Sequence, residues 1–326
     1  MSAEPILRVE GLVKHFPIKG GLFGRPKVVR AVDGVSFDVA PGETLGIVGE
    51  SGCGKSTTAR LLVKLIEPDT GQITFAGKLL GRDLGLRELR RHVQMVFQDS
   101  YASLNPRLTM ADAIAFGPQV HGVAESKATK LARDLLDRVG LDPSRFAGRY
   151  PHELSGGQRQ RVNIARALAF EPEVIVLDEA VSALDKSVEA QVLNLLVDLR
   201  QERKLTYVFI SHDLNVVRFI SDRVMVMYLG EVAEIGPVEA IYDHPGHPYT
   251  QALLAAMPSM DPDRRTTEVP LSGDPPNPID PPAGCRFHTR CRHAFARCGE
   301  IAPPPHLLAE RHRAACHLLG EEARAA

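Results

Sequence analysis

The sequence predicts an α/β fold built on a mainly parallel sheet. Over the first 240 or so residues, short apolar runs alternate with segments of helical periodicity, as strands and crossover helices do in such a sheet. The clearest buried-strand candidates are TLGIVG (44–49), EVIVLDE (173–179) and LTYVFISHD (205–213), each with polar residues at its end. Because ligands bind beyond the carboxyl ends of parallel strands, we expect these polar residues to converge.

Two further regions depart from this alternation. A long, largely helical stretch at about residues 100–165 is predicted to be an inserted subdomain. From Pro245 the composition shifts, and HPGHPYTQALLAAMP (244–258) leads to SGDPPNPIDPPAG (272–284), which is too rich in proline for a helix or a central strand. We expect the second segment to be a semi-rigid connector to a small tail module.

The overall composition excludes several classes of protein. The 326 residues are 44% hydrophobic and 24% charged, with a net charge of −1, so no basic excess points to nucleic acid as a partner. No apolar stretch approaches the length of a membrane span, and MSAEPILRVE at the start lacks the layout of a secretion signal. We therefore expect a cytosolic chain.

A phosphate-binding loop is predicted at GESGCGKST (49–57), which matches G-x-x-x-x-G-K-[ST] directly after a predicted strand and before a helical pattern. Its glycines let backbone amides surround a phosphate chain. Lys55 would reach the β and γ phosphates, and Ser56 would ligate Mg²⁺. Cys53 occupies a variable position of the pattern and is expected to be a small filler, not a reactive thiol.

Polar residues at other strand ends suit the same chemistry. Asp178 would hold Mg²⁺ through its water shell, and Glu179 would polarise or orient an attacking water, since adjacent carboxylates of an extended chain point in different directions. His212 falls where a γ-phosphate contact is needed. Gln98, after VQMVF, suits Mg²⁺ or the attacking water.

The segment LSGGQRQR (154–161) places two glycines at a predicted helix start. Ser155 and Gln158 fit a capping box, which explains those two residues but not Gly156 and Gly157. Bare backbone at the positive end of a helix dipole would let an anion approach. A cap alone and an anion site both remain open from these residues.

The order of the motifs resembles that of ATP-binding cassette (ABC) proteins: Walker A at 49–57, a Q-loop at Gln98, LSGGQ at 154–158, Walker B at 174–179, a D-loop SALD at 182–185, and His212. The resemblance covers about residues 5–240. It implies a P-loop NTPase core with a parallel-sheet RecA-like subdomain, an antiparallel β subdomain and the inserted helical subdomain. In this family the LSGGQ helix contacts the nucleotide of the opposing subunit.

The resemblance also implies a set of site residues. Phe16 would stack on adenine, Glu179, His212 and Gln98 would be catalytic, and Ser56, Gln98 and Asp178 would hold Mg²⁺. The residues expected around ATP are Phe16, Gly49, Glu50, Ser51, Gly52, Cys53, Gly54, Lys55, Ser56, Thr57, Gln98, Asp178, Ser155, Gly156, Gly157, Gln158 and Asp185.

Three segments are similar to the ATPase subunits of bacterial oligopeptide and dipeptide importers: FQDSYASLNPR, DEAVSALD and HPGHPYTQALL…GCRFHTRC. This implies an ATP-hydrolysing motor at the cytoplasmic face of the membrane, partnered by a second identical or related ATPase subunit, two integral-membrane permeases and, through them, an extracytoplasmic substrate-binding protein. Nickel chelates or glutathione are alternative cargoes. A soluble cassette ATPase acting on DNA or ribosomes is a rival function, but neither long coiled coils nor a second cassette occurs.

Four cysteines crowd the end of the chain with the spacing C-x5-C-x6-C-x17-C, from Cys285 through Cys291 and Cys298 to Cys316. Zinc sites usually contain a tight C-x2–4-C pair, which is absent. The resemblance favours a [4Fe-4S] cluster, with Zn²⁺ or unligated structural thiols as alternatives. Because no motif links this tail to the phosphates, we expect it to be structural. Histidines that could replace a ligand are His288, His293, His312 and His317.

Overall fold

The computed structural model describes residues 4–18, 27–257 and 276–320. The chain divides into two compact units, each described by itself below. Unit 1 consists mainly of Gly77–Ser211, with the short segment Ala40–Glu43. Unit 2 combines Pro5–Val39 and Thr44–Ala76 with the chain from His212 onward, so segments far apart in the sequence share one unit.

Three parallel strands form the centre of unit 1. Strand β7 (Val174–Asp178) pairs with β6 (Val93–Val96) on one side and with β8 (Thr206–Ile210) on the other. Every residue of β7 and β8 is buried, as the continuous apolar sequence predicts for a parallel sheet. The short elements β5 (Lys78–Leu79) and α2 (Leu86–His92) precede β6, and α7 (Lys186–Arg203) connects β7 to β8.

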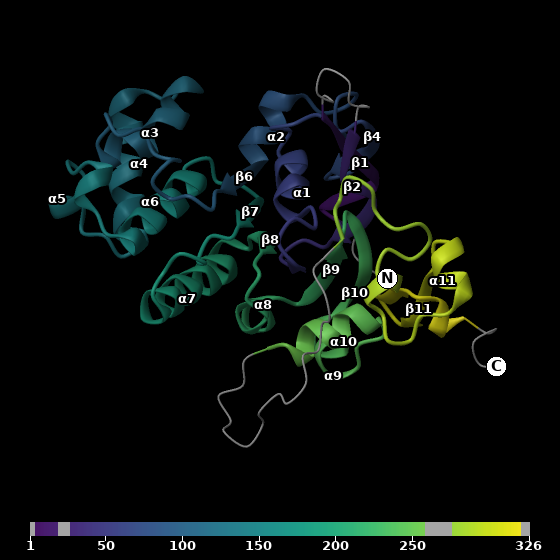
Figure 1. Ribbon diagram of the computed structural model, residues 1–326. Coiled ribbons are helices and arrows are strands. Elements are labelled where there is room, and N and C mark those ends of the chain that lie inside the picture. Colours follow the sequence, from purple (N-terminus) through teal and green to yellow (C-terminus); the bar gives the residue numbers. More distant parts are fainter. Residues whose placement is uncertain (1–3, 19–26, 258–275, 321–326) are drawn as a thin grey trace. The chain divides into compact units, whose positions relative to one another are not determined.

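The predicted helical insertion is confirmed within unit 1 (Figure 1). Its helices are α3 (Met110–Val120), α4 (Glu125–Arg138), α5 (Pro143–Phe146) and α6 (Gly156–Leu168), with a 3₁₀ turn at Pro151–Glu153. Helices α3, α4 and α6 pack against one another. On α4, the buried residues Ala128, Ala132, Leu135 and Leu136 recur at helical spacing and form its packed face.

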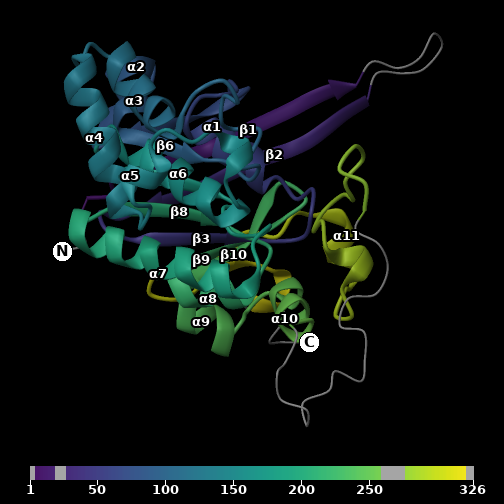
Figure 2. The same cartoon turned by 90° about the vertical axis from the view of Figure 1, so that its left-hand side faces the viewer.

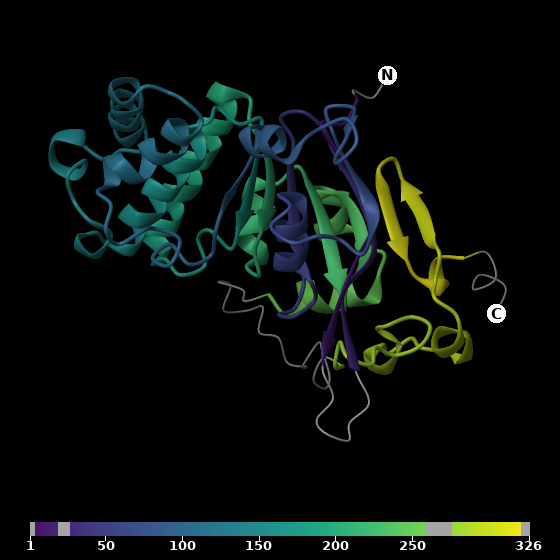
Figure 3. The same ribbon diagram turned by 90° about the horizontal axis from the view of Figure 1, so that it is seen from above.

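Unit 2 contains a parallel strand pair, β3 (Thr44–Val48) and β9 (Arg223–Tyr228). β9 continues antiparallel into β10 (Glu231–Pro237), which pairs in turn with β12 (His312–Ala315) of the tail. β12 also forms a hairpin with β11 (Pro305–Ala309), drawn in yellow in Figure 3. The helices of this part are α1 (Lys55–Leu62), α8 (Leu214–Ile220), α9 (Val238–Asp243) and α10 (Pro248–Ala255).

An antiparallel sheet in unit 2 confirms the expected β subdomain. β1 (Leu7–Ile18) pairs with β2 (Lys27–Val39) on one side and β4 (Thr70–Phe75) on the other. β1 and β2 run side by side as a long ribbon in Figure 2. Alternate residues of β1 such as Leu7 and Val9 are fully buried, as a half-buried strand requires.

The tail beyond the proline-rich connector consists of short elements besides the β11–β12 hairpin. These are η2 (His288–Arg290), α11 (Ala296–Glu300) and η3 (His317–Leu319). Residues 258–275, which include the first part of the expected connector, lie outside the described residues. The tail belongs to unit 2, and the domain boundary near residue 240 stays a prediction. Within the described ranges, no helix is both long and apolar enough to cross a membrane.

Candidate nucleotide-binding site

The predicted phosphate loop connects β3 to α1 in unit 2, and its backbone requires glycine at two positions. Gly49 has φ 149° and Gly54 has φ 106°, both in the region that L side chains rarely adopt. A Cβ atom would lie 2.2 Å from the carbonyl oxygen of Met227 at Gly49, and 2.1 Å from that of Ala31 at Gly54. These glycines let the loop pack directly against neighbouring backbone.

The loop has the features of an anion cradle. Lys55 is 5% exposed, and its Nζ donates hydrogen bonds to the carbonyl oxygens of Gly49 at 2.7 Å and Glu50 at 3.0 Å. Within the described part of the chain, the backbone amides of Ser51, Gly52 and Gly54 donate to no other group. Unpaired amides beside a buried ammonium group are the donor set that a phosphate chain needs, so these residues fit the predicted ligand.

Cys53 of the loop is 3% exposed. Burial raises the pKa of its thiol above the ordinary value, although the nearby Lys55 acts in the opposite direction. A thiol that is both buried and protonated is a poor nucleophile, which agrees with its expected role as a small filler.

The tail contacts this loop through side chains that lie outside the recognised motifs. The guanidinium group of Arg290 lies 2.7 Å (Nη1) and 3.1 Å (Nη2) from the two carboxylate oxygens of Glu50. The backbone N–H of Glu50 donates to the hydroxyl of Tyr249 at 3.0 Å. The tail is thus linked to the phosphate loop by side chains that belong to no recognised motif, and its structural role stays a prediction.

The predicted carboxylate pair lies at the end of β7 in unit 1. Asp178 is 3% exposed, and Glu179 follows with φ 46°, a left-handed conformation that is uncommon for a residue with a side chain. The Nε2 of Gln98, which follows β6, donates to Oε2 of Glu179 at 2.7 Å. Two of the predicted catalytic residues thus meet beyond adjacent parallel strands. The backbone strain at Glu179 was not foreseen, and such outliers cluster at functional sites.

The start of α6 confirms the predicted capping box. The N–H of Gln158 donates to Oγ of Ser155 at 3.3 Å, and the N–H of Ser155 donates to Oε1 of Gln158 at 3.0 Å. The two glycines differ. A Cβ on Gly157 would lie 2.3 Å from Cγ1 of Val188 on α7, whereas one on Gly156 would make an ordinary 3.6 Å contact with Leu184. Packing within the chain therefore explains Gly157, a reason that sequence reasoning missed.

Other predicted residues are distributed over both units. Asp185 is the N-cap residue of α7 in unit 1, where its side chain makes no capping hydrogen bond. Phe16 lies on β1 of unit 2, 38% exposed, with Nζ of Lys14 5.6 Å from its ring centroid. An exposed ring is available for stacking, and its role toward adenine stays a prediction. His212 begins the last segment of unit 2, and its γ-phosphate contact stays a prediction as well.

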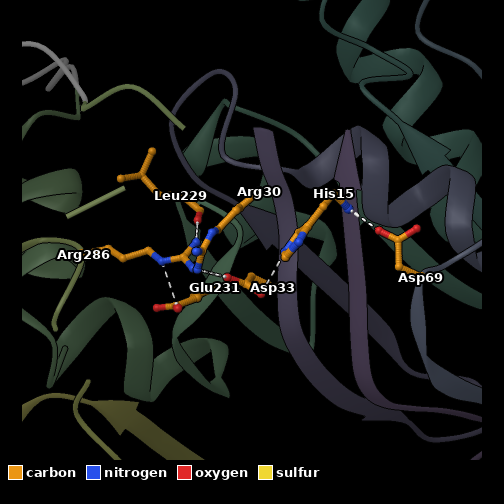
Figure 4. A network of polar contacts seen from close by, with 7 residues as sticks. All are labelled: His15, Arg30, Asp33, Asp69, Leu229, Glu231 and Arg286. Carbon is orange, nitrogen blue, oxygen red and sulfur yellow. Dashed lines mark hydrogen bonds and ion pairs between the residues drawn. The ribbon is translucent and has the colours of Figure 1, made fainter. Parts of the chain in front are cut away.

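A polar network fixes the strands next to Phe16 (Figure 4). Nε2 of His15 lies 3.0 Å from Oδ1 of Asp33, whose other carboxylate oxygen pairs with the buried guanidinium group of Arg286. Arg286 also pairs with Glu231 at 2.9 Å and donates to the carbonyl oxygen of Leu229. Burial alone would raise the pKa of Asp33, but hydrogen bonds from Arg286 and His15 outweigh it and lower that pKa. This part of the tail is thus joined to β2 and β10 by charge.

The four tail cysteines are free thiols, with Cys298 and Cys316 buried. Burial, with a smaller repulsion between the neighbouring cysteines, raises the pKa of Cys285 and of Cys316 to about 11. No group of three or more His, Cys, Asp or Glu residues in the described ranges is arranged to hold a metal ion.

Three of the histidines considered as replacement ligands have other partners. Nε2 of His312 lies 2.7 Å from the buried carboxylate of Glu234, and Nε2 of His317 lies 2.8 Å from the carbonyl oxygen of Ile301. Nδ1 of His288 lies 2.8 Å from the carbonyl oxygen of Cys285. These contacts favour structural roles for them.

Comparison with known families and proteins matches two regions of the chain. The family described as "ABC transporter" matches residues 32–182, and "Oligopeptide/dipeptide transporter, C-terminal region" matches residues 233–298. The chain is 51% identical to a probable peptide ABC transporter ATP-binding protein, y4tS, of Sinorhizobium fredii, over 99% of this chain and 92% of the relative. It is also 51% identical to the oligopeptide transport ATP-binding protein AppF of Bacillus subtilis, over 97% of this chain and 98% of the relative.

Solved structures of ABC ATPases share the fold. CbiO1 from Clostridium perfringens, part of the ABC transporter complex cbiONQ, is 29% identical with a TM-score of 0.63, over 74% of this chain and 92% of its own. The ATP-binding cassette MJ0796, solved as a dimer bound to ADP and Pi, is 30% identical with a TM-score of 0.61, over 71% of this chain and 98% of its own. With the phosphate loop, the carboxylate pair and the capped glycine helix all in place, the chain belongs to the ABC transporter family of ATP-binding proteins.

Proposed function

We propose that this chain is the ATP-hydrolysing motor subunit of a bacterial peptide importer, with dipeptides or oligopeptides as cargo. The observation that carries the ATPase chemistry is the hydrogen bond between Gln98 and Glu179, directly after the buried Asp178. The names of the relatives, peptide and oligopeptide transport ATP-binding proteins, support the cargo class.

The residues divide the work of hydrolysis. Lys55 and the loop amides would bind the phosphates, and Ser56, Gln98 and Asp178 would hold Mg²⁺. When bound, Mg²⁺ neutralises charge on the phosphates. Glu179 would accept a hydrogen bond from the attacking water, and Gln98 would orient the carboxylate that does so.

A second ATPase subunit, identical or related, would complete each site. Ser155, Gly156 and Gln158 at the start of α6 would contact the γ-phosphate held by the partner's loop, because a helix N-terminus favours an anion. Closure of the pair would drive two permeases at the cytoplasmic face of the membrane, which receive cargo from an extracytoplasmic substrate-binding protein. Cargoes such as nickel chelates or glutathione are alternatives.

Substitution of Glu179 by Gln tests the catalytic assignment. The amide keeps the side-chain shape but cannot accept a proton, so ATP binding should persist while hydrolysis falls by about 10²- to 10⁴-fold. The measurement is single-turnover hydrolysis beside nucleotide affinity. Near-normal turnover would remove Glu179 from its proposed role. Purification from membranes with integral-membrane proteins, and not with nucleic acid or ribosomes, tests the transport assignment.

For the tail we propose a structural [4Fe-4S] cluster on Cys285, Cys291, Cys298 and Cys316. Support comes from the confinement of the four cysteines to one short module. The side chains would have to rearrange to ligate it, since the described residues contain no preformed metal group. Anaerobically purified protein should be brown and contain about four irons per chain. Colourless protein with stoichiometric zinc would decide for Zn²⁺, and metal-free, ordered protein would exclude both.

A further inference from the structure

The segment Cys285–Cys291 of the tail reaches the phosphate loop through Arg290. The guanidinium group forms a bidentate pair with the Glu50 carboxylate: Nη1 lies 2.7 Å from one oxygen and Nη2 lies 3.1 Å from the other. Nη1 also donates a hydrogen bond to the hydroxyl of Tyr228 at 3.3 Å. The Arg290 side chain is 5% exposed and that of Glu50 22% exposed. A bidentate ion pair that is largely buried is stronger and more directional than an ion pair on the surface.

The backbone of the same loop residue is held independently. The N–H of Glu50 donates to the hydroxyl of Tyr249, a fully buried residue of α10. Burial raises the pKa of this phenol, which therefore stays neutral and accepts the hydrogen bond. Tyr249 packs against Tyr228 and against Phe287 of the tail, with ring centroids 4.5 and 5.3 Å apart. Glu50 is thus fixed both at its amide and at its carboxylate.

Arg286, on the same tail segment, supports the phosphate loop at Cys53. The carbonyl oxygen of Cys53 accepts a hydrogen bond from the N–H of Gly230 at 2.9 Å. Gly230 follows Leu229, whose carbonyl oxygen accepts from Arg286 (Figure 4). Arg286 and Arg290 therefore support the loop from the same short tail segment, Arg286 through the turn between β9 and β10 and Arg290 directly.

We propose that Arg290 is a positioning residue for ATP binding: it neutralises and fixes Glu50, so that the phosphate loop presents its amides and Lys55 to the nucleotide without a competing carboxylate charge. The inference rests on the proposed function, because it takes residues 49–57 as the nucleotide loop. An uncompensated carboxylate within this loop would repel the triphosphate and could instead attract the Lys55 ammonium group.

The test uses the full chain and a fluorescent ATP analogue, with affinity measured by titration and the thermal midpoint recorded for every variant. Arg290→Ala should weaken binding about ten-fold, because the Glu50 carboxylate then lacks its partner and repels the triphosphate. Arg290→Lys should lose less nucleotide affinity than Arg290→Ala, because lysine keeps the positive charge but cannot form the bidentate pair. Arg292→Ala, an exposed arginine of the same tail, is the matched control and should bind normally.

A second substitution separates positioning from mere loss of structure. If the Glu50 charge is what Arg290 controls, Glu50→Gln combined with Arg290→Ala should restore most of the lost affinity, because no carboxylate is then left unpaired. A tail that had simply unfolded would not be rescued in this way. No recovery in the double variant, or unchanged affinity in Arg290→Ala, overturns the inference.

Lys55→Ala distinguishes this inference from the proposed function. If Lys55→Ala binds the analogue as tightly as the native chain, the loop assignment itself is wrong. If Lys55→Ala loses binding while Arg290→Ala keeps it, the loop assignment holds and only the role of Arg290 fails.

Discussion

The phosphate loop before α1 and the start of α6 both place glycines at a helix N-terminus, yet for different physical reasons. At the loop, Gly49 and Gly54 have positive φ angles and pack against backbone carbonyl groups, which cannot move aside. At α6, Gly157 is crowded by a side chain, Val188, and Gly156 is open. The same residue type thus marks an obligatory backbone shape in one place and a replaceable packing contact in the other.

The largest effect is expected at Gly54. Gly54→Ala combines a left-handed backbone with a clash against the carbonyl oxygen of Ala31, and should destabilise the protein on the order of 3 kcal/mol and abolish nucleotide binding. Gly52→Ala is the matched control, because φ is +80° there but nothing lies within 4 Å of the added Cβ. Its cost should be only about 1 kcal/mol. Urea unfolding measures the stability of the two variants, and titration measures their nucleotide affinity. Equal losses in Gly52→Ala and Gly54→Ala would show that the clash at Gly54 is not what matters.

The open glycine of α6 provides the test across two chains. Gly156→Asp should leave nucleotide binding by the isolated chain intact but block closure, because a carboxylate repels the incoming γ-phosphate. Gly157 is unsuitable for this purpose, since any side chain there meets Val188. Mixing Gly156→Asp chains with Lys55→Ala chains should restore hydrolysis that neither variant shows alone. If every mixture stays inactive, a site shared between chains is excluded.

Gly157→Ala tests the packing explanation alone. Overpacking should cost about 1–3 kcal/mol of unfolding free energy. The second substitution Val188→Ala removes the Cγ1 atom in the way, so the double variant should recover part of that loss. Chemical denaturation of the single and double variants gives the coupling. If the two changes in unfolding free energy were strictly additive, packing against Val188 would not explain the glycine at position 157.

The smallest effect is expected from the cap. Ser155→Ala removes the acceptor of the Gln158 amide and should cost about 1 kcal/mol, visible as a lower unfolding midpoint. Ser155→Asp retains an acceptor at the cap and serves as the control for stability. A full loss of stability in both variants would show that the hydroxyl does more than cap the helix.

Local patterns made most of the fold predictable. The buried strands β3, β7 and β8 lie within the predicted runs, and the helical insertion was foreseen, although its helices run from Met110 to Leu168 instead of 100–165. The spacing of Ser155 and Gln158 predicted the capping box, and the strand ends marked Gln98 and Glu179 as candidates, although not their hydrogen bond to each other. These features depend on neighbours in sequence or on adjacent parallel strands, for which periodicity is informative.

The rest depends on contacts that no local pattern encodes. Arg290 and Glu50 are 240 residues apart, and neither is unusual in its own segment. The clash that requires glycine at position 157 comes from Val188 on another helix. The left-handed backbone at Glu179 is likewise not signalled by its neighbours in the sequence. These three features become visible only in the tertiary structure.

The pairing of β12 with β10 has a consequence for modular exchange between relatives. Glu234 of β10 is fully buried, and its carboxylate is satisfied by the N–H groups of Gly246 and His247 and by His312 of β12. A chimera that took its tail from another member of the family would have to bring a histidine at position 312, and arginines at 286 and 290 as well. A tail without these residues would leave the Glu234 carboxylate short of one partner and Glu50 unpaired.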